Sequence, residues 1–496
     1  MSDTEPILPG FYPDPSICRV GDTYYLINSS FEYLPGIPIH VSTDLVTWTL
    51  VGNALTGPSQ MAEHDGYPSA GIFAPTIRHH DGRFWIIGTN VNEIPQGRGH
   101  FLISAEDPAV PWSDPVHIAG AIGIDPDIVW DEEGTVHVSW CSLNPEQPGI
   151  LSAPVDTTTG AMTGPARQLW QGSGLAFPEG PHLYRIGEWW YLLLAEGGTE
   201  RGHVVTIARA RTLDGPFEPA PHNPILSHRS RAHPVQNTGH ADLIELADGT
   251  WAAVHLGVRP RGQTPGFHVN GRETFLVGID WVDGWPVVDE SRFTPSRADY
   301  AFEERFEDTE LHPRWLGVGR FPASFTETAP GGGILVEADG RGHALLAARA
   351  TDLAWSATAR FEPASDGSAG RLLVRVDDRN WYGLTFDGRT VEATVAIGPV
   401  QHSLGCLDIP AGTVPTLCIS VNDAPLLPHG VALEPDLVEL AVTVDGVEHS
   451  FGAIDGRYLS TEVTGGFTGR VFGVEALAGS IHVHEIRYTP TPSRNT

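Results

Sequence analysis

The chain has 496 residues and a formal charge of −31, from 61 acidic and 30 basic side chains. This length is too great for one ordinary hydrophobic core, so we expect two domains. The acidic excess leaves no surplus of cations to neutralise phosphates, which argues against nucleic acid as a partner. All 30 basic residues are arginine, and a chain without lysine excludes catalysis through a Schiff base, pyridoxal phosphate or a P-loop.

The sequence also indicates where the protein resides. Residues 1–6 lack the charged and apolar regions of a signal peptide, and no apolar stretch approaches the length of a membrane span. None of the cysteines has CxxC spacing: Cys18, Cys141, Cys406 and Cys418. Cys18 and Cys141 fall in apolar strand patterns, so we interpret them as buried thiols rather than metal ligands or disulfide partners. We therefore predict a reduced, soluble, cytoplasmic protein with no membrane partner.

One pattern recurs five times before residue 300: a short apolar run, a Gly-containing turn and a second, aromatic-rich run. Such a unit is typical of a β-hairpin. The copies open at Asp14, Ala74, Asp125, Glu179 with Gly180, and His240. All-β units repeated at intervals of roughly 50–60 residues predict a five-bladed β-propeller, in which the first strand of each blade lines a central channel.

The propeller would bring the opening residues of the copies together at the channel axis. Pro13 and Pro15 restrict the backbone around Asp14 to extended conformations. Taken singly, Asp14, Asp125 and Glu179 would each be a turn-capping residue at the start of a strand. Three carboxylates at matching repeat positions are costly to bring together, so we interpret them as functional.

Glycoside hydrolysis requires such carboxyl groups. One takes a proton from water while another, kept protonated, donates its proton to the leaving oxygen. Asp14, which we expect to be the most exposed, suits the base. Glu179 follows the apolar run 176–178, which we expect to raise its pKa as an acid requires. Asp125 is expected to hold a negative charge against Glu179 and to raise that pKa further.

The character of the sequence changes near residue 300. Residues 289–297 form a polar, proline-containing segment that we interpret as a linker. From about residue 301, alternating apolar and polar residues between turns, as in 372–386, predict an antiparallel β-sandwich of the concanavalin-like jelly-roll type. We assign the propeller to residues 1–298 and the sandwich to residues 299–496.

Five ordered motifs resemble those of glycoside hydrolase family 43: Asp14-Pro-Ser, Gly123-Ile-Asp-Pro, Glu179-Gly-Pro-His-Leu-Tyr, Gly239-His-Ala-Asp-Leu and Gly271-Arg-Glu-Thr-Phe-Leu-Val. The likeness is to its β-xylosidases and α-L-arabinofuranosidases that carry a C-terminal β-sandwich, and it loosens after residue 290. The resemblance implies a five-bladed propeller and inversion of the anomeric centre. It places the base on Asp14, the pKa-modulating and substrate-positioning carboxylate on Asp125, and the general acid on Glu179.

The resemblance implies roles for further residues, each with an alternative. Arg272 matches an arginine that hydrogen-bonds the sugar; the alternative is an arginine of a surface loop. Phe31 matches an aromatic wall of the pocket. Phe467 is similar to a residue of the sandwich that closes the pocket, although core packing would explain it equally. His240 matches a histidine that helps to hold a structural calcium ion or a water at the propeller axis, or is a satisfied buried histidine. No cofactor is implied for the reaction.

Two positions depart from the family pattern. Phe73, beside the substrate-binding floor, stands where many relatives carry Trp, and this leaves the sugar preference open. Asp127 stands where Ser is usual. Its carboxylate either perturbs Glu179 or points into the blade, and we favour the second.

Three other classes of protein were considered. A lectin-like carbohydrate-binding propeller does not need three convergent carboxylates. A retaining fructan or sucrose hydrolase would show Asn-Asp-Pro-Asn and Arg-Asp-Pro motifs, and neither occurs. A structural interaction propeller would lack the matches at Arg272 and His240. An enzyme is therefore the favoured interpretation.

We predict an inverting exo-glycosidase that releases terminal pentoses, α-L-arabinofuranosyl or β-D-xylosyl, from plant hemicellulose oligosaccharides. The motif at Glu179 and residues 234–240 favour the arabinofuranosidase slightly, and action on another sugar stays an alternative. The sandwich would block one side of the channel and leave a pocket, which favours exo over endo action. The sequence leaves a homo-oligomeric state open.

Overall fold

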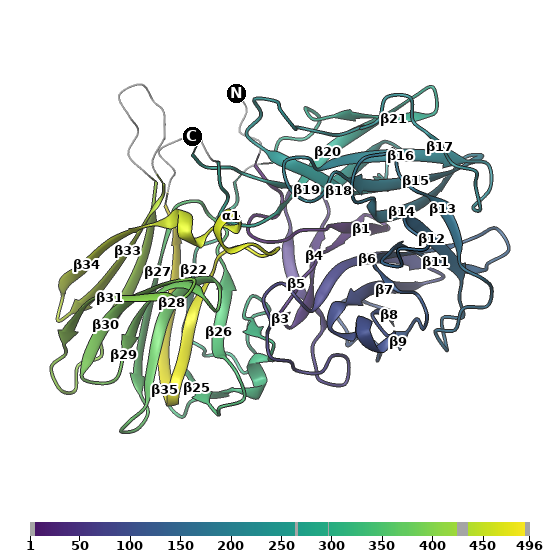
Figure 1. Ribbon diagram of the computed structural model, residues 1–496. Helices are drawn as coiled ribbons and strands as arrows, with labels where there is room; N and C mark the ends of the chain where they lie inside the picture. Colours follow the sequence, from purple (N-terminus) through teal and green to yellow (C-terminus); the bar gives the residue numbers. More distant parts are fainter. Residues whose placement is uncertain (1–4, 263–265, 296, 424–434, 492–496) are drawn as a thin grey trace.

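A computed structural model describes residues 5–262, 266–295, 297–423 and 435–491. These residues form two lobes that are built almost entirely of β-strands, one coloured purple to teal and the other green to yellow (Figure 1). Among them, no helix has both the length and the apolar character needed to cross a membrane. The short helical segments are η1 (Val91–Gln96), η2 (Pro322–Ser324), η3 (Gly456–Leu459) and α1 (Thr461–Thr464).

The first lobe contains five four-stranded antiparallel sheets, each made from one continuous stretch of chain. They are β1 (Ser16–Val20), β2 (Thr23–Ile27), β4 (Gly36–Ser42) and β5 (Thr49–Leu55); β6 (Ile72–His80), β7 (Arg83–Asn90), β8 (His100–Ala105) and β9 (Val116–His117); β10 (Gly123–Trp130), β11 (Val136–Ser142), β12 (Ile150–Pro154) and β13 (Arg167–Trp170); β14 (Glu179–Ile186), β15 (Trp189–Glu196), β16 (Val204–Ala210) and β17 (Glu218–Pro219); β18 (Gln236–Glu245), β19 (Trp251–Val258), β20 (Glu273–Val282) and β21 (Trp285–Asp289). The innermost strands β1, β6, β10, β14 and β18 are neighbours in a closed ring. The predicted five-bladed propeller is confirmed.

Burial between the blades explains why these strands are apolar on both faces. Successive side chains of a strand point to opposite faces of its sheet. Ile86 accordingly packs in the cluster between the first and second blades, while Ile87 packs between the second and third. Leu192 and Leu193 divide in the same way between the two sides of the fourth blade. Five such clusters, one in each gap between neighbouring blades, stabilise the ring.

The second lobe has two β-layers that share one long strand, β35 (Val471–Pro490). One layer contains β26 (Ala344–Arg349), β28 (Ala369–Asp377), β29 (Asn380–Phe386), β30 (Thr390–Ile397) and β31 (Val400–Asp408). The other contains β22 (Phe302–Glu304), β24 (Thr326–Thr328), β25 (Ile334–Ala338), β27 (Trp355–Pro363), β32 (Thr416–Asn422), β33 (Leu437–Val444) and β34 (Val447–Asp455). Because β35 continues from one layer into the other, the strands form a single curled sheet of 13 strands.

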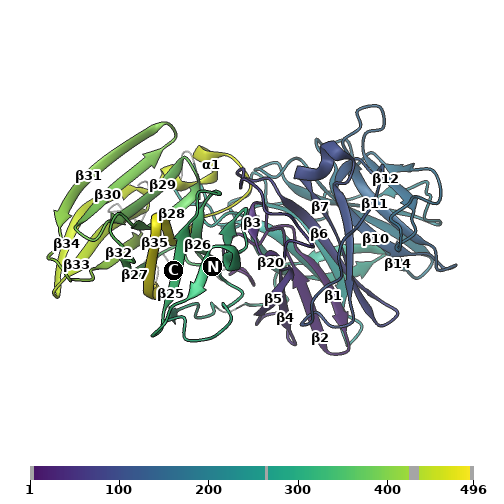
Figure 2. The same ribbon diagram turned by 90° about the horizontal axis from the view of Figure 1, so that it is seen from below.

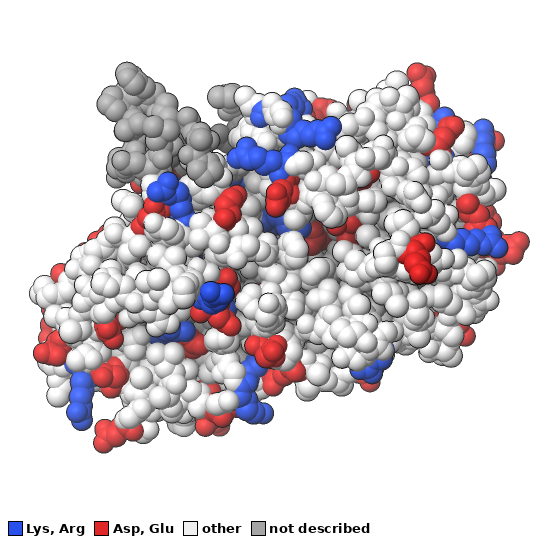
Figure 3. All heavy atoms as spheres, in the orientation of Figure 1, with Lys and Arg blue, Asp and Glu red and all other residues white. Residues whose placement is uncertain are grey.

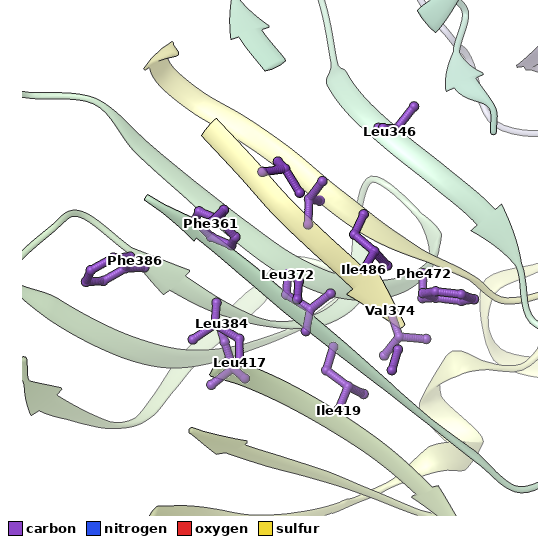
Figure 4. Packing of buried hydrophobic residues seen from close by; sticks show 14 of the residues in the cluster. Leu346, Phe361, Leu372, Val374, Leu384, Phe386, Leu417, Ile419, Phe472 and Ile486 are labelled. Atoms are coloured by element: carbon purple, nitrogen blue, oxygen red, sulfur yellow. The ribbon is translucent and has the colours of Figure 1, made fainter. Parts of the chain in front are cut away.

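Gly479 marks the change of layer in β35 and has a φ of 58°, a conformation that glycine adopts at little cost. Apolar side chains from both layers meet in the space that the curled sheet encloses, among them Leu372, Leu417 and Ile486 (Figure 4). The predicted β-sandwich is thus confirmed as one curled sheet. The four cysteines are free thiols, and Cys18 is buried while Cys141 is partly buried.

The two lobes are joined by more than the chain between β21 and β22. Strand β23 (Gly317–Val318) of the second lobe pairs with β3 (Tyr33–Leu34) of the propeller. An apolar cluster crosses the same boundary, with Phe11 from one side and Leu345 from the other. Helix α1 lies between the lobes in both views (Figures 1 and 2). The loop that follows α1 is held against the propeller, because the Phe467 N–H donates to Ser69 Oγ at 2.8 Å.

Candidate active site

The residues that open the sequence repeats share an unusual backbone conformation. The φ angles of Asp14, Asp125, Gly180 and His240 are 54°, 55°, 57° and 44°. In β10, β14 and β18 the pairing register shifts across this position, as in a β-bulge. A left-handed conformation is strained for a residue other than glycine, and it persists where the surrounding structure imposes it. The same local distortion therefore recurs at the inner end of four blades.

Gly180, rather than Glu179, occupies the repeat position of Asp14 and Asp125. A Cβ atom at Gly180 would lie 2.9 Å from His240 Nε2, so this position has no room for a side chain. Glu179 is the residue directly before this position. The fourth blade thus presents its acid from a different backbone position than the first and third blades do, a difference that the repeat pattern alone did not reveal.

All predicted site residues line one pocket. Its volume is about 390 Å³, within the usual range for small-molecule sites of about 300–1,000 Å³. Its walls include Asp14, Phe31, Phe73, Asp125, Glu179, His240, Arg272 and Phe467. In the space-filling view, acidic atoms are recessed in the hollow between the two lobes (Figure 3). The structure therefore brings together every residue that the motifs selected.

The sequence did not single out the loop after β15. Gly197, Gly198, Thr199 and Glu200 line the pocket, as do Ile124 and Phe177. Thr199 has a defined contact, because Arg272 Nη1 donates to its Oγ1 at 3.0 Å. The Gly-Gly pair was a readable signal of a turn, but nothing in the pattern placed that turn at the channel.

Asp14 is a buried carboxylate with three polar partners. Its Oδ1 lies 3.0 Å from Arg272 Nη1 and 3.5 Å from His240 Nδ1, and its Oδ2 accepts a hydrogen bond of 2.6 Å from Ser29 Oγ. Burial alone would raise the pKa of Asp14, but Arg272, His240 and Ser29 together hold it below its usual value. Asp14 is therefore ionised at neutral pH.

The expectation that Asp14 is the most exposed of the three acids was wrong. Its side chain is 6% exposed, against 22% for Glu179. The flanking prolines also do not hold Asp14 in the extended conformation that we expected, since its φ is 54°, and Arg272 and Ser29 cover its carboxylate. Its charge is stabilised by these partners rather than by water.

Glu179 has the opposite electrostatic environment. Burial and the negative charge of Asp14 raise its pKa to about 7, against the opposing effect of Arg272. The nearest histidine, His203, is 4.0 Å from Glu179 Oε1. Burial lowers the pKa of His203 to about 3, so this ring is neutral and adds no positive charge. A large fraction of Glu179 therefore keeps its proton near neutrality, as predicted.

Asp125 interacts with both of the other acids. Burial, Glu179 and Asp14 raise the pKa of Asp125 well above its usual value, although its Oδ2 accepts a hydrogen bond of 3.3 Å from the Gly180 N–H. A negative charge on either Asp125 or Glu179 would raise the pKa of the other, so the expected effect of an ionised Asp125 on Glu179 stays a prediction. Among the described residues, Arg272 forms an ion pair with Asp14 and with neither of the other two acids, so it stabilises the charge of Asp14 most strongly.

Three phenyl rings form the apolar wall of the pocket. The ring of Phe31 stacks on that of Phe467, with centroids 5.8 Å apart, and Phe73 meets both rings edge-on at 5.5 and 5.6 Å. The Arg272 guanidinium lies 5.7 Å from Phe31 and 5.4 Å from Phe467. Phe467 belongs to the pocket wall rather than to the sandwich core, and it reaches the propeller from the second lobe.

The donors around His240 do not fit a calcium ion. Calcium takes six to eight oxygen ligands. The one carboxylate paired with His240 among the described residues is Asp14, which is already bound to Arg272 and Ser29. Burial lowers the pKa of His240 to about 4, so the ring is a neutral, buried imidazole beside Asp14. Of the two interpretations of His240, the structure favours the satisfied buried histidine.

Asp127 points away from the pocket. It is fully buried, and its Oδ1 pairs with Arg78 Nη2 at 2.9 Å. Its Oδ2 accepts the Leu183 N–H at 2.7 Å. Asp127 therefore does not act on Glu179, as the preferred interpretation held, but its carboxylate reaches the inner strands β6 and β14 of the neighbouring blades rather than the interior of its own blade.

A propeller of five blades with three acids of unequal pKa in one pocket defines the chain as a glycoside hydrolase. Residues 4–286 match the model of the glycosyl hydrolases family 43. Relatives match over nearly the whole length, so the second lobe is shared as well. The chain belongs to this family.

Two curated relatives show the range of names in the family. A non-reducing end alpha-L-arabinofuranosidase of Bacteroides ovatus is 36% identical over 95% of this chain and 90% of its own length. A xylosidase/arabinosidase of Butyrivibrio fibrisolvens is 34% identical over 95% of both chains. Among solved structures, the GH43B protein of the Bacteroides ovatus xyloglucan locus superposes with a TM-score of 0.87 at 32% identity, covering 98% of this chain and 99% of its own.

Proposed function

We propose that the protein is an inverting exo-glycosidase that removes single terminal pentoses, α-L-arabinofuranosyl or β-D-xylosyl, from plant hemicellulose oligosaccharides. The observation that carries this proposal is the division of charge in the pocket. Asp14 is held ionised by Arg272, while Glu179, with a pKa of about 7, keeps a proton. A base and an acid are thus both ready in the same protonation state of the enzyme.

In the proposed reaction, Asp14 removes a proton from a water molecule as the water attacks the anomeric carbon. The bond from that carbon to the leaving oxygen breaks, and Glu179 donates its proton to this oxygen. Asp14 ends protonated and Glu179 ionised, and exchange with solvent restores both. Attack from the face opposite the leaving group inverts the anomeric configuration.

Asp125 and Arg272 have binding roles in this proposal. A protonated Asp125 offers both a donor and an acceptor to a sugar hydroxyl. Arg272 Nη1 already contacts Asp14 and Thr199, and the remaining guanidinium protons suit a second hydroxyl. The phenyl wall gives the apolar face of a sugar ring a surface to lie against.

Exo action is supported by the closure of the pocket. Phe467 and the loop after α1 approach from the second lobe and narrow the space beside Arg272. A volume of about 390 Å³ suits one sugar and part of the next rather than a long chain. The relatives named as arabinofuranosidase and xylosidase/arabinosidase support a pentose. The cytoplasmic location and any homo-oligomeric state stay predictions.

The test compares nitrophenyl α-L-arabinofuranoside with nitrophenyl β-D-xylopyranoside. We expect hydrolysis of at least one substrate and a loss of about 100-fold or more in kcat for Asp14→Asn. For Glu179→Gln we expect a loss of about 100-fold or more on an oligosaccharide, whose leaving group needs the proton. Glu200→Gln is the matched control, because Glu200 is an exposed carboxyl group on the same pocket. Its activity should stay within a few-fold of the wild type. Activity on neither pentoside, or a Glu179→Gln enzyme that keeps wild-type activity on the oligosaccharide, would contradict the proposal.

A further inference from the structure

A second ring of side chains lies along the inner strands, two residues after the positions that open the five sequence repeats. It consists of Ser16, Thr76, Asp127, His182 and Asp242. Arg78 also lies on β6, but two residues after Thr76, so it does not occupy the repeat position of the ring. Its guanidinium contacts members of the ring on all the other inner strands, which makes Arg78 the common partner of the five blades.

The guanidinium of Arg78 contacts side chains on four other inner strands. Its Nη1 lies 2.9 Å from Asp242 Oδ2 on β18 and 3.4 Å from Ser16 Oγ on β1. Its Nη2 lies 2.9 Å from Asp127 Oδ1 on β10 and 3.0 Å from His182 Nδ1 on β14. Since β6 supplies the arginine itself, every blade contributes one group to this cluster.

Charge makes the guanidinium necessary. The carboxylates of Asp127 and Asp242 are fully buried. Among the described residues, Arg78 is the only arginine that forms an ion pair with either of them. Two buried carboxylates without a cation would repel each other and would lack compensation for the loss of water. The Arg78 side chain is 15% exposed, so its position in the channel is accessible to a small ion.

The cluster is tied directly to the pocket by short stretches of strand. Ser16 follows Asp14, Asp127 follows Asp125 and Asp242 follows His240, each by two residues. The fourth blade is joined through Asp127, whose Oδ2 accepts the N–H of Leu183 at 2.7 Å. A shift of the ring therefore moves the backbone that carries the acids of the pocket.

We propose that Arg78 is the axial cation of this propeller, a positioning residue that occupies the place of an axial metal ion and fixes the spacing of the acids above it. This proposal accounts for two separate observations. Asp127 stands where Ser is usual because it supplies the second carboxylate of the guanidinium. The donors around His240 do not form a calcium site because the axis already holds a positive charge.

The test replaces the built-in cation and then restores it from solution. In Arg78→Ala, we expect kcat to fall by about 100-fold through displacement of the acids, with KM changed much less. Guanidinium chloride at low millimolar concentration should recover at least about tenfold of this loss, and Ca²⁺ should recover part of it. Arg78→Lys, which keeps a charge, should lie between the wild type and Arg78→Ala.

Thermal unfolding without substrate gives a readout that does not depend on the proposed hydrolysis. Guanidinium and Ca²⁺ should raise the Tm of Arg78→Ala and leave the Tm of the wild type unchanged. Arg83→Ala is the control, since Arg83 lies in the same hairpin, is 43% exposed, and pairs only loosely with Glu106 at 3.5 Å. No cation should affect it. A wild-type protein that is inactive on both pentosides would refute the proposed function, but the thermal-unfolding experiment would still test the role of Arg78.

Three results would overturn the proposal. The first is a wild-type protein whose Tm or activity falls on treatment with a chelator and returns with Ca²⁺. The second is a folded Arg78→Ala variant that no cation rescues. If Arg78→Ala does not fold, the triple variant Arg78→Ala, Asp127→Asn, Asp242→Asn is expected to fold, because it has no buried carboxylates in the cluster that need a cation. The third result that would overturn the proposal is a triple variant that also fails to fold.

Discussion

The charge of Arg272 should set the lower pH limit of activity. Arg272 Nη1 lies 3.0 Å from Asp14 Oδ1, and both side chains are buried. Two unit charges about 4 Å apart interact by about 4 kcal/mol at an effective dielectric constant of 20, which corresponds to about 3 pKa units. His240 and Ser29 remain beside Asp14 in a variant, and water enters the vacated space. We therefore expect Arg272→Met to raise the pKa of Asp14 by about 1–3 units.

The sign follows from the role of Asp14 as the base. Its pKa is depressed in the wild type, so activity persists to low pH and is lost only as Asp14 protonates. In Arg272→Met the acidic limb of kcat/KM should move upward by the same about 1–3 units. The basic limb should also rise, because Arg272 lowers the pKa of Glu179. The pH profile separates this effect from the loss of sugar binding, which lowers kcat/KM at all pH values.

Ser29→Ala provides the control for this experiment. It removes the hydrogen bond of 2.6 Å to Asp14 Oδ2 without removing a charge, so its acidic limb should move upward by less than that of Arg272→Met. An acidic limb that stays in place in Arg272→Met, or one that moves no further than in Ser29→Ala, would refute the reasoning.

Three further substitutions test other parts of the site. Glu179→Gln should lose about 10²–10⁴-fold in kcat on oligosaccharides, and much less on a dinitrophenyl glycoside, whose leaving group needs no proton; an equal loss on both would contradict the acid role. Phe467→Ala should raise KM about 2- to 10-fold with kcat less affected, by loss of its ring contacts with Phe31; an unchanged KM would remove Phe467 from the binding surface. Gly180→Ala should destabilise the fold by about 1–3 kcal/mol in urea unfolding, more than Gly187→Ala, because both have positive φ but only Gly180 faces a neighbour, His240.

Much of the fold, and several of the residues that form the site, could be predicted because the five sequence repeats indicate both the blades and the residues at their inner ends. An apolar run, a turn and a second, aromatic-rich run in each copy predict one hairpin, and five such hairpins predict five blades. Since every copy opens at the channel, Asp14 and Asp125 could be placed together without a structure. Arg272 and Phe467, by contrast, were placed by resemblance to a family, and no local pattern would have selected them.

The electrostatics could not be predicted from the sequence. The exposure of Asp14 depends on Arg272, which reaches it from a distant part of the chain, and on Ser29, which follows the second strand of the same hairpin. The negative charge that acts on Glu179 depends on which acid forms an ion pair with Arg272, and this is determined by the three-dimensional geometry of the site. Asp127 and Asp242 each lie two residues after the opening of a repeat, whereas Arg78 lies four residues after one. Their interaction with Arg78 could therefore be identified only from the structure.

The most direct test of the account is the anomeric configuration of the first product, followed by ¹H NMR on the pentoside that the wild-type enzyme cleaves faster. An ionised Asp14 that activates water, opposite a protonated Glu179, predicts that the sugar is released with the configuration opposite to that of the substrate, before mutarotation. Release with the same configuration would mean that a carboxylate attacks the sugar itself, and would contradict the assignment of Asp14 as a base.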